Sequence, residues 1–381
     1  MRLLFVSDFL PNWNSGAEGT LLSIGDALEK RGHKVTHLWK DTSARLLMHP
    51  RLSDLFELPR GQLQCVSSAL RQSAFDVVIL SQPYSYLVYE QLASRYPRTL
   101  FLNRTHGWED RMSESWRHLG WRQTSRVERC LSDLAAARLG KACERTVKAA
   151  HGIIAASDLC ASYIRNHYSQ NETPVTVIPY GVESHLFRDR RNESSQRLLF
   201  VGQYLPRKGS QILEHVLPRV AESYRNASVT FVVPEGQIEQ VKSIYAPPFG
   251  NRLTVLPWMP RERLAAIYTS HDILMFPSFF EGFGKVFLEG MAAGACVVGF
   301  REGGLPDVAT HGRDALMCDT GDMHAFRMLT ERALGNAALT NGIGVRGRET
   351  ARRYTWERHA LETEKFCLQL KFGQVETALA S

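Results

Sequence analysis

The sequence predicts an α/β protein of two domains of similar size, each built around a parallel sheet covered by helices. Two observations lead to this prediction. The chain has 381 residues, which is more than a single hydrophobic core usually accommodates. Short apolar runs of strand length also alternate with segments of helical spacing along most of the chain, as in repeated βαβ units.

The first half contains six predicted strands with helical segments between them. Helical spacing is found, for example, at Gly19–Arg31 and Gln62–Ser73. The loop Ser15–Gly19 follows the first strand and precedes a helix, which is where an open α/β sheet binds ligands. This loop lacks the GxGxxG spacing of a dinucleotide-binding fingerprint. The strands are expected at Leu3–Ser7, Lys34–Leu38, Asp76–Leu80, Thr99–Asn103, Gly152–Ala156 and Val175–Ile178.

The second half repeats the pattern after the polar stretch Glu183–Gln196, the predicted linker. We expect an N-terminal domain at 1–184 and a C-terminal domain at 185–365, with strand ends facing across a cleft. The segment Val345–Leu370 has helical spacing and predicts one or two amphipathic helices that close the fold and pack back on the first domain. The strands are expected at Arg197–Val201, Val229–Val233, Leu253–Leu256, Asp272–Phe276 and Cys296–Phe300.

The composition favours a soluble enzyme in the cytoplasm. Hydrophobic residues make up 44% of the chain and charged residues 22%, which is ordinary for a globular protein. No apolar run approaches the roughly 20 residues that span a bilayer, and Met1–Asp8 reads as a first strand and not as a signal segment. Seven scattered cysteines without a CxxC pair favour reduced thiols over a disulfide framework or a zinc site.

The positive charge is concentrated between Arg104 and Lys148. This segment holds ten Lys/Arg against six Asp/Glu, together with Trp108, Trp116 and Trp121. Such a mixture suits an anionic membrane surface, an acidic acceptor or nucleic acid. A solvated helix that packs its apolar side on the domain explains it equally well. As a partner of this segment we expect the inner face of an anionic membrane, which it would contact peripherally, and we do not expect nucleic acid.

Two glutamates, Glu281 and Glu289, stand in a strand, glycine loop and helix. The loop contains Gly282 and Gly284, and a helix is predicted at Val286–Ala293. Free backbone N–H groups and the positive end of the helix dipole favour an anion or a sugar at such a turn. With Glu281 in the loop and Glu289 about two turns into the helix, the two would reach different parts of one long ligand. The alternative is a carboxylate at a helix N-terminus and an unrelated surface residue.

A second glycine loop, Gly202–Gly209, follows the first strand of the second domain and carries Arg207 and Lys208. A guanidinium fork and an ammonium point charge at a strand end suit a phosphate or a diphosphate. In a parallel sheet this loop is expected near the loop of Glu281.

These motifs, taken in order, resemble a retaining glycosyltransferase of glycosyltransferase family 4, whose GT-B fold consists of two facing Rossmann-like domains. The agreement runs from Met1 to about Lys365, which makes it more specific than any single motif. The matching segments are SGAEGTLLSIGDALEKRGHKV, THGWE, AASDLCASYI, VTVIPYGVESHLF, VGQYLPRKG, Leu256–Gly312 and YTWERH.

The resemblance implies transfer of a sugar from a nucleoside-diphosphate sugar to an acceptor hydroxyl, with an α-linked product and without a metal or other cofactor. In a front-face reaction, the leaving phosphate would take the acceptor proton. Glu281 and the following backbone amides would face the sugar and diphosphate, Glu289 would bind the ribose hydroxyls, and Lys208 would bind the diphosphate. The other matching positions are Gly282, Phe283 and Gly284 in the Glu281 loop, Gly16 and Ala17 in the N-terminal glycine loop, and His106 close to the transferred sugar.

The sequence departs from the family pattern in the diphosphate loop. Gln203 stands where arginine is usual, and Arg207 is the candidate to supply the missing charge. The other departures are Ala17 for glycine, Tyr180 for asparagine and Cys296 for proline. Two alternatives stay open at this point: a non-catalytic partner subunit that binds a sugar nucleotide, and a sugar-nucleotide epimerase or phosphorylase of the same architecture. The acceptor, whether glycolipid, polysaccharide or small metabolite, is not encoded in any pattern of the Arg45–Gly61 stretch.

Overall fold

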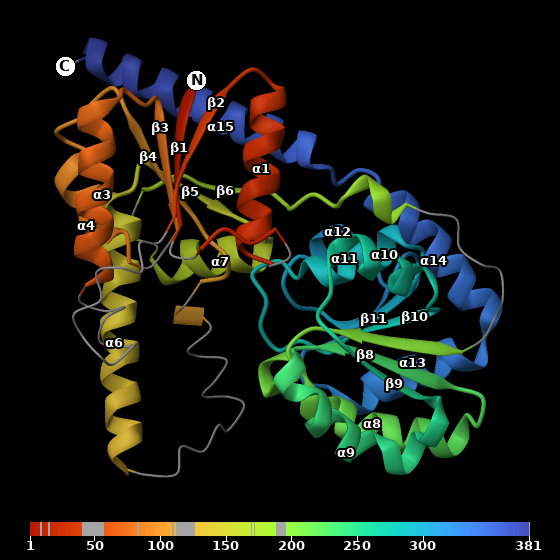
Figure 1. The fold of residues 1–381 in the computed structure, drawn as a ribbon. Helices are drawn as coiled ribbons and strands as arrows, with labels where there is room; N and C mark the ends of the chain where they lie inside the picture. Colours follow the sequence, from red (N-terminus) through yellow and green to blue (C-terminus); the bar gives the residue numbers. More distant parts are fainter. Residues whose placement is uncertain are drawn as a thin grey trace. The chain divides into compact units, whose positions relative to one another are not determined.

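The computed structural model consists of two compact units, Met1–Tyr180 together with Trp356–Ser381, and Gly181–Thr355 (Figure 1). It describes residues 1–7, 10–13, 16–39, 57–81, 84–108, 110–111, 126–168, 170, 172–187 and 196–380. The sequence placed the domain boundary at 184 and assigned 356–365 to the second domain. In the structure the chain passes between the units at 180/181 and 355/356, because the last helix packs on the first unit.

The first unit contains a six-stranded parallel sheet in the order β2-β1-β3-β4-β5-β6. Its strands are rich in Val, Ile and Leu, and β1, β3, β4 and β5 are almost entirely buried, as expected when helices cover both faces. The strands are β1 (Arg2–Val6), β2 (Lys34–Leu38), β3 (Val77–Ser81), β4 (Leu100–Arg104), β5 (Gly152–Ala155) and β6 (Val175–Val177). The helices include α1 (Glu18–Lys30), α3 (Leu58–Gln72), α4 (Tyr86–Leu92), α6 (Arg126–Ala149), α7 (Asp158–His167) and α15 (Trp356–Ala380).

The second unit contains another six-stranded parallel sheet, in the order β12-β11-β10-β7-β8-β9. This is the Rossmann order. From β7 the chain first adds β8 and β9 on one side of the sheet and then β10, β11 and β12 on the other, so the strand order reverses between β7 and β10. The strands are β7 (Arg197–Val201), β8 (Ser228–Val233), β9 (Leu253–Pro257), β10 (Ile273–Phe276), β11 (Cys296–Phe300) and β12 (Leu316–Cys318). The helices include α8 (Ser210–Ser223), α9 (Ile238–Phe249), α10 (Arg261–Thr269), α11 (Lys285–Ala292), α12 (Leu305–Val308), α13 (Met323–Gly335) and α14 (Ala337–Ala351).

The sequence located the strands well, and each predicted strand is present with its ends shifted by at most one residue. Strand β12 was missed, because its three residues are too few to show a period. The final segment forms two helices with different roles. Helix α14 belongs to the second unit and α15 to the first, and the chain leaves helical conformation between them near Tyr354 and Thr355.

Helix α15 packs against α1 and β4 of the first unit (Figure 1). Phe366 and Leu370 lie so close to Gly152 of β5 that a Cβ atom there would come within 2.9 and 2.8 Å of their side chains. At the start of the helix, His359 Nδ1 lies 2.8 Å from the carbonyl oxygen of Pro179. The helix therefore completes the hydrophobic core of the first unit.

The structure corrects part of the prediction for the basic segment. Trp108 is fully buried, and its indole N–H donates to the Tyr168 hydroxyl at 3.3 Å. Arg104 is also buried, with 2% of its surface exposed. Neither can belong to a surface that meets a membrane, while Trp116 and Trp121 lie outside the described residues.

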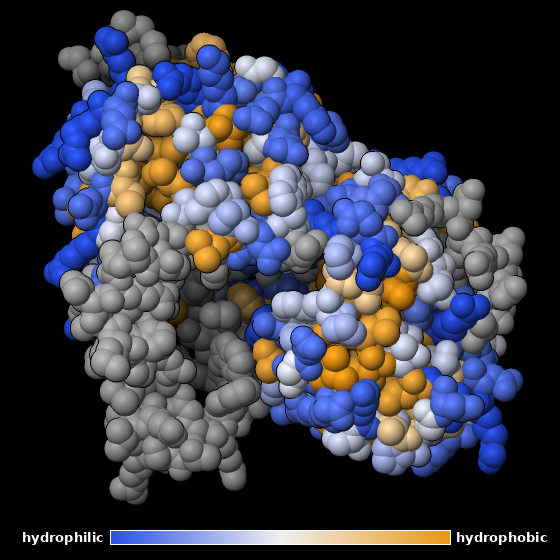
Figure 2. Space-filling model, viewed as in Figure 1, coloured by the Kyte–Doolittle hydropathy of each residue, from blue (hydrophilic) through white to orange (hydrophobic). Residues whose placement is uncertain are grey.

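Hydrophilic residues cover most of the coloured surface in Figure 2, and hydrophobic residues form separate patches among them. Among the helices that the structure describes, none is long and apolar enough to cross a membrane.

Replacing Phe366 by alanine should destabilise the first unit by about 3 kcal/mol, because it leaves a cavity between α15 and β5. Phe372→Ala, in the same helix, is the matched control, since Phe372 is 69% exposed and its loss should change stability by less than about 0.5 kcal/mol. Thermal unfolding of both variants measures the difference. Equal melting temperatures would show that α15 does not contribute to this core.

Candidate functional site

The candidate site of the second unit lies at the carboxyl ends of β7 and β10, the two neighbouring strands between which the strand order of the parallel sheet reverses. The loop after β7 carries Lys208 and the loop after β10 carries Glu281. The N–H of Phe279 donates to the carbonyl of Arg207 at 2.9 Å, which joins the two loops directly. Gly209 has a φ of 83°, and a Cβ atom there would lie 2.2 Å from the Pro277 oxygen. This junction therefore requires glycine.

Lys208 and Glu281 form an ion pair in which the ammonium donates to Glu281 Oε1. Their side chains are 20% and 10% exposed, so the pair is largely shielded while its edge is open to solvent. The pair confirms the expectation that the two loops lie close together. A partly desolvated cation beside a carboxylate can change partners when an anionic ligand enters.

Glu302, in the loop after β11, supports the Glu281 loop and was not singled out in the sequence. Its Oε1 accepts a hydrogen bond from the backbone N–H of Glu281 at 3.1 Å, and the residue is 3% exposed. Gly303 has a φ of 62° and lies against the backbone of Phe283. The sequence offered one indication of a role for Glu302, which is that it follows β11, the strand next to β10.

The residues Gly282, Phe283 and Gly284 turn the chain into α11. Gly284 has a φ of 88°, and its carbonyl accepts from the Phe287 N–H at 3.1 Å. The Phe283 side chain is 1% exposed and packs near the Phe287 ring, with 5.2 Å between their centroids. Only the backbone of Phe283 is therefore suited to meet a ligand, as expected from the sequence.

Glu289 is the fifth residue of α11 and lies in its second turn, not about two turns into the helix. The prediction was wrong by nearly one turn: the five residues from Lys285 to Glu289 span little more than one turn, although the helix begins one residue before the predicted start at Val286. Tyr268, in α10, donates its hydroxyl to Glu289 Oε2 at 2.7 Å. Burial, and then the Glu289 charge, raise the pKa of Tyr268 well above its ordinary value, so Tyr268 remains a donor. The carboxylate keeps further acceptor positions.

Lys285 links Glu289 to the start of the second unit. Its ammonium lies 3.6 Å from Glu289 Oε1 and 3.5 Å from Glu183 Oε1. Arg261 Nη1 also donates to Glu183 Oε1, at 2.6 Å. Burial opposes ionisation of Glu183, but the charges of Lys285 and Arg261 outweigh it and leave the pKa of Glu183 below its usual value.

Gln203 and Arg207 are paired, because the Arg207 guanidinium donates to the Gln203 side-chain oxygen. Gln203 occupies the place of the family's arginine, and it holds a different arginine in the same loop. This contact keeps a positive charge beside Lys208.

In the first unit, Gly16 and Ala17 precede α1. The Thr20 hydroxyl donates to the Gly16 carbonyl, and Gly16 is exposed with no atom within 4 Å of a Cβ built there. Ser15 of the predicted loop lies outside the described residues.

His106 follows β4, and its Nε2 lies 3.3 Å from Ser81 Oγ and 3.2 Å from Arg104 Nη1. Burial, and then the Arg104 charge, lower the pKa of His106 well below its ordinary value. The imidazole is therefore neutral at physiological pH. The sequence did not indicate Ser81 or Arg104 as contacts of His106.

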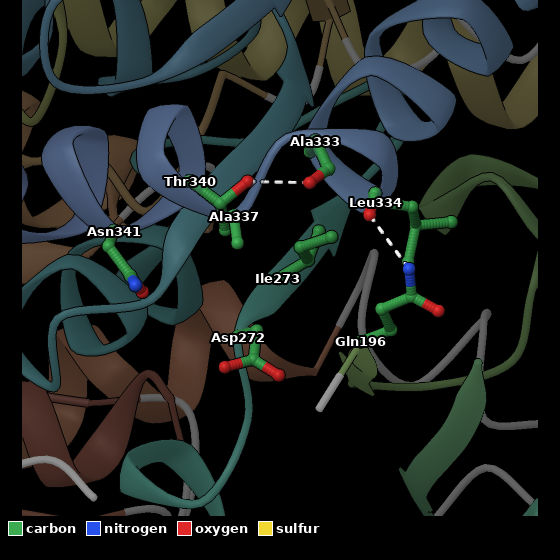
Figure 3. Close-up of a pocket in the computed structure, with 8 residues that line it drawn as sticks. All are labelled: Gln196, Asp272, Ile273, Ala333, Leu334, Ala337, Thr340 and Asn341. Atoms are coloured by element: carbon green, nitrogen blue, oxygen red, sulfur yellow. Dashed lines mark hydrogen bonds between the residues drawn. The ribbon is translucent and has the colours of Figure 1, made fainter. Parts of the chain in front are cut away.

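A small pocket of the second unit lies at the amino ends of the strands, opposite to the candidate site (Figure 3). Gln196 and Asp272 line it and directly precede β7 and β10, whereas Lys208 and Glu281 follow these strands. Gln196 Nε2 closes one side by donating to the Leu334 carbonyl at 2.9 Å. Because parallel sheets bind substrates at the carboxyl ends of their strands, this pocket is not the candidate site.

Two family models match the chain in succession. The model described as Glycosyltransferase Family 4 matches residues 14–186, and the model described as Glycosyl transferases group 1 matches residues 195–336. His106 of the first unit falls within the first match, and Lys208, Glu281 and Glu289 of the second unit fall within the second. The chain belongs to the family 4 glycosyltransferases. A curated relative is the D-inositol 3-phosphate glycosyltransferase of Corynebacterium efficiens, 28% identical over 50% of this chain and 50% of the relative. The chain thus matches about half the length of such relatives.

Solved structures show that this family 4 member has the GT-B fold. Sucrose-phosphate synthase from Thermosynechococcus elongatus superposes with a TM-score of 0.77 at 19% identity, covering 97% of this chain and 98% of that one. HepE of Anabaena, solved in complex with UDP and glucose, gives a TM-score of 0.67 at 17% identity, with 96% and 99% covered.

The ionic contacts of Glu183 predict a pH-dependent contribution to stability. Its folded-state pKa lies below the unfolded value of about 4.3, so its contribution is present above that pH and is lost as the pH falls through the folded pKa. Glu183→Gln should lower stability by roughly 1–3 kcal/mol at pH 7. The difference from wild type should shrink as the pH falls below about 4.5.

Melting temperatures between pH 7 and pH 3 measure this difference. Glu262→Gln is the control, since Glu262 is exposed in the same helix as Arg261. A difference for Glu183→Gln that stays constant or grows towards low pH would contradict the assignment.

Proposed function

We propose that the protein is a retaining glycosyltransferase that moves a sugar from a nucleoside-diphosphate sugar to an acceptor hydroxyl and forms an α-glycosidic bond. The observation that carries this proposal is the ion pair of Lys208 and Glu281 at the point where the second sheet reverses direction. A cation, which suits a phosphate, and a carboxylate, which suits sugar hydroxyls, thus lie side by side at a glycine-rich helix start.

The donor would lie along this loop and helix. Lys208 and Arg207 would bind the diphosphate, with the backbone of Gly282 and Gly284 close to it. Glu281 would accept hydrogen bonds from the sugar, and Glu289 would accept them from the ribose. Because Tyr268 holds one oxygen of Glu289, the carboxylate is oriented before the ligand arrives.

The first unit would contribute Gly16, Ala17 and His106 as contacts of the donor and the transferred sugar. Peripheral contact with an anionic membrane is also part of the proposal, through residues of the basic segment other than Arg104 and Trp108.

The proposed reaction breaks the bond between the anomeric carbon and the phosphate oxygen and forms a bond from the same face to the acceptor oxygen. The acceptor proton passes to the leaving phosphate oxygen. Negative charge develops on the diphosphate, where Lys208 and Arg207 would stabilise it by preorganised electrostatics. Glu281 accepts hydrogen bonds and does not attack the sugar.

The comparisons support the donor class and leave the acceptor open. HepE, which shares the fold, was solved with UDP and glucose bound, and relatives are named as glycosyltransferases, including a mannosyltransferase from Mycolicibacterium hassiacum. A glycolipid, a polysaccharide and a small metabolite all satisfy the proposal.

Lys208→Met should lower kcat/KM by about 10²–10³-fold, because it removes a cation that stabilises the leaving diphosphate. The assay incubates the protein with a panel of nucleoside-diphosphate sugars and acceptors and follows release of nucleoside diphosphate, with and without EDTA. We expect EDTA to have no effect. Lys242→Met is the control, because Lys242 is exposed in α9 and pairs with Glu239.

Two results would overturn parts of this proposal. Failure to release nucleoside diphosphate with any donor and acceptor, combined with tight donor binding, would favour a non-catalytic binding subunit. Conversion of the donor sugar without an acceptor would favour an epimerase.

Glu289→Gln should weaken donor binding by roughly tenfold, since it removes a charged acceptor of the ribose hydrogen bonds. Calorimetric titration with the nucleoside diphosphate and with its deoxyribose analogue measures the effect. Wild type should discriminate between these two ligands more strongly than the variant does. Glu239→Gln, at a side chain that is 85% exposed, is the control, and equal discrimination by wild type and Glu289→Gln would refute the ribose assignment.

A further inference from the structure

His106 is held from one side by a side chain that can only donate hydrogen bonds. Arg104 Nη1 lies 3.2 Å from His106 Nε2, and a guanidinium has no acceptor. Nε2 must therefore present its lone pair to Arg104. In a neutral imidazole the other ring nitrogen, Nδ1, then carries the proton.

Arg104 itself is fixed in an unusual environment. It is the last residue of β4 and is 2% exposed. Its guanidinium carbon lies 5.1 Å from the centre of the Tyr180 ring, and the Tyr180 hydroxyl lies 3.4 Å from the carbonyl oxygen of Thr105. Within the described part of the chain, Nε and Nη2 of Arg104 have no hydrogen-bond partner. A buried guanidinium that leaves donors unsatisfied carries a free-energy cost, so its contact with His106 requires an explanation.

We propose that Arg104 is a positioning residue that fixes His106 as the neutral tautomer protonated at Nδ1, so that His106 meets its ligand as a hydrogen-bond donor. The identity of that ligand as a sugar hydroxyl rests on the proposed function, whereas the tautomer does not. The Nε2 lone pair is occupied by Arg104 and approached by Ser81. His106 therefore does not take the acceptor proton, which leaves that proton to the phosphate oxygen.

Two titratable side chains near Arg104, His359 and Tyr180, do not change charge near neutral pH. Burial lowers the pKa of His359, in α15, to about 3, and burial raises the pKa of Tyr180. Cys160, in α7, is a buried thiol near Tyr180 and Thr105. The titration of His106 can therefore be followed without a change of charge at His359 or Tyr180.

Nitrogen NMR of the ligand-free protein labelled in its histidines tests the proposal directly. His106→Gln identifies the signals of His106 among those of the 13 histidines. We expect a protonated Nδ1 and an unprotonated Nε2, unchanged between pH 8 and pH 5. Protonation at Nε2, or a midpoint near the ordinary value of about 6.5, would overturn the proposal. No sugar donor is used, so this result is independent of glycosyl transfer.

Arg104→Met should let His106 Nε2 carry the ring proton, because the donor that requires a lone pair there is gone, and should lower kcat roughly 10–100-fold, as expected for a misplaced contact to the reacting sugar. The donor KM should change much less, because the donor contacts proposed in the second unit are intact. Arg104→Lys should restore part of kcat and the tautomer protonated at Nδ1, since a lysine ammonium also has no acceptor. Arg145→Met is the matched control, since its guanidinium lies 4.0 Å from the Tyr86 ring centre and pairs with Glu90.

If His106 in Arg104→Met still has a protonated Nδ1 and an unprotonated Nε2, as in wild type, the positioning role is overturned, even if that variant is less stable. If Arg104→Met does not fold, the tautomer of the wild-type protein decides alone.

Discussion

The candidate donor site depends on the direct junction of two loops at the point where the second sheet reverses direction. One backbone hydrogen bond, from Phe279 N–H to the Arg207 carbonyl at 2.9 Å, holds the loops after β7 and β10 together. The contact is this close because Gly209 has no side chain. Because the two loops are fixed side by side, Lys208 and Glu281 form their ion pair at a smaller cost in side-chain conformational entropy. A shift of either strand would separate the two groups that the proposed chemistry needs.

The ion pair also determines how the two charged groups of the site are stabilised. Two charged groups at a largely buried position would be costly if they stood alone. Each therefore serves as the other's partner until a ligand with phosphate and hydroxyl groups can replace both interactions. Glu289 follows the same principle, because Tyr268 and Lys285 hold its two oxygens. The site is thus satisfied internally and oriented for a ligand that carries matching groups.

The sequence was sufficient for features that depend on local pattern or on a position after a strand. The strands are continuous apolar runs, and Lys208 and Glu281 follow neighbouring ones, so their proximity could be predicted. Features that depend on side-chain direction could not. Nothing in the sequence shows that Glu302 accepts from the Glu281 backbone, that Gln203 pairs with Arg207, or that Arg104 and Trp108 turn inwards. Strand β12 was too short to give a period.

The first unit is assembled from two pieces of chain that are far apart in sequence, and this bears on synthesis. The first 180 residues emerge from the ribosome well before Trp356–Ala380 has been synthesised. Until then, the surfaces of α1 and β5 that α15 covers are exposed to solvent, together with the apolar walls around Gly152. The second unit, Gly181–Thr355, is continuous and can complete its own sheet first. The nascent first unit therefore carries an unfinished hydrophobic surface while the second is being made, the type of surface that chaperones recognise.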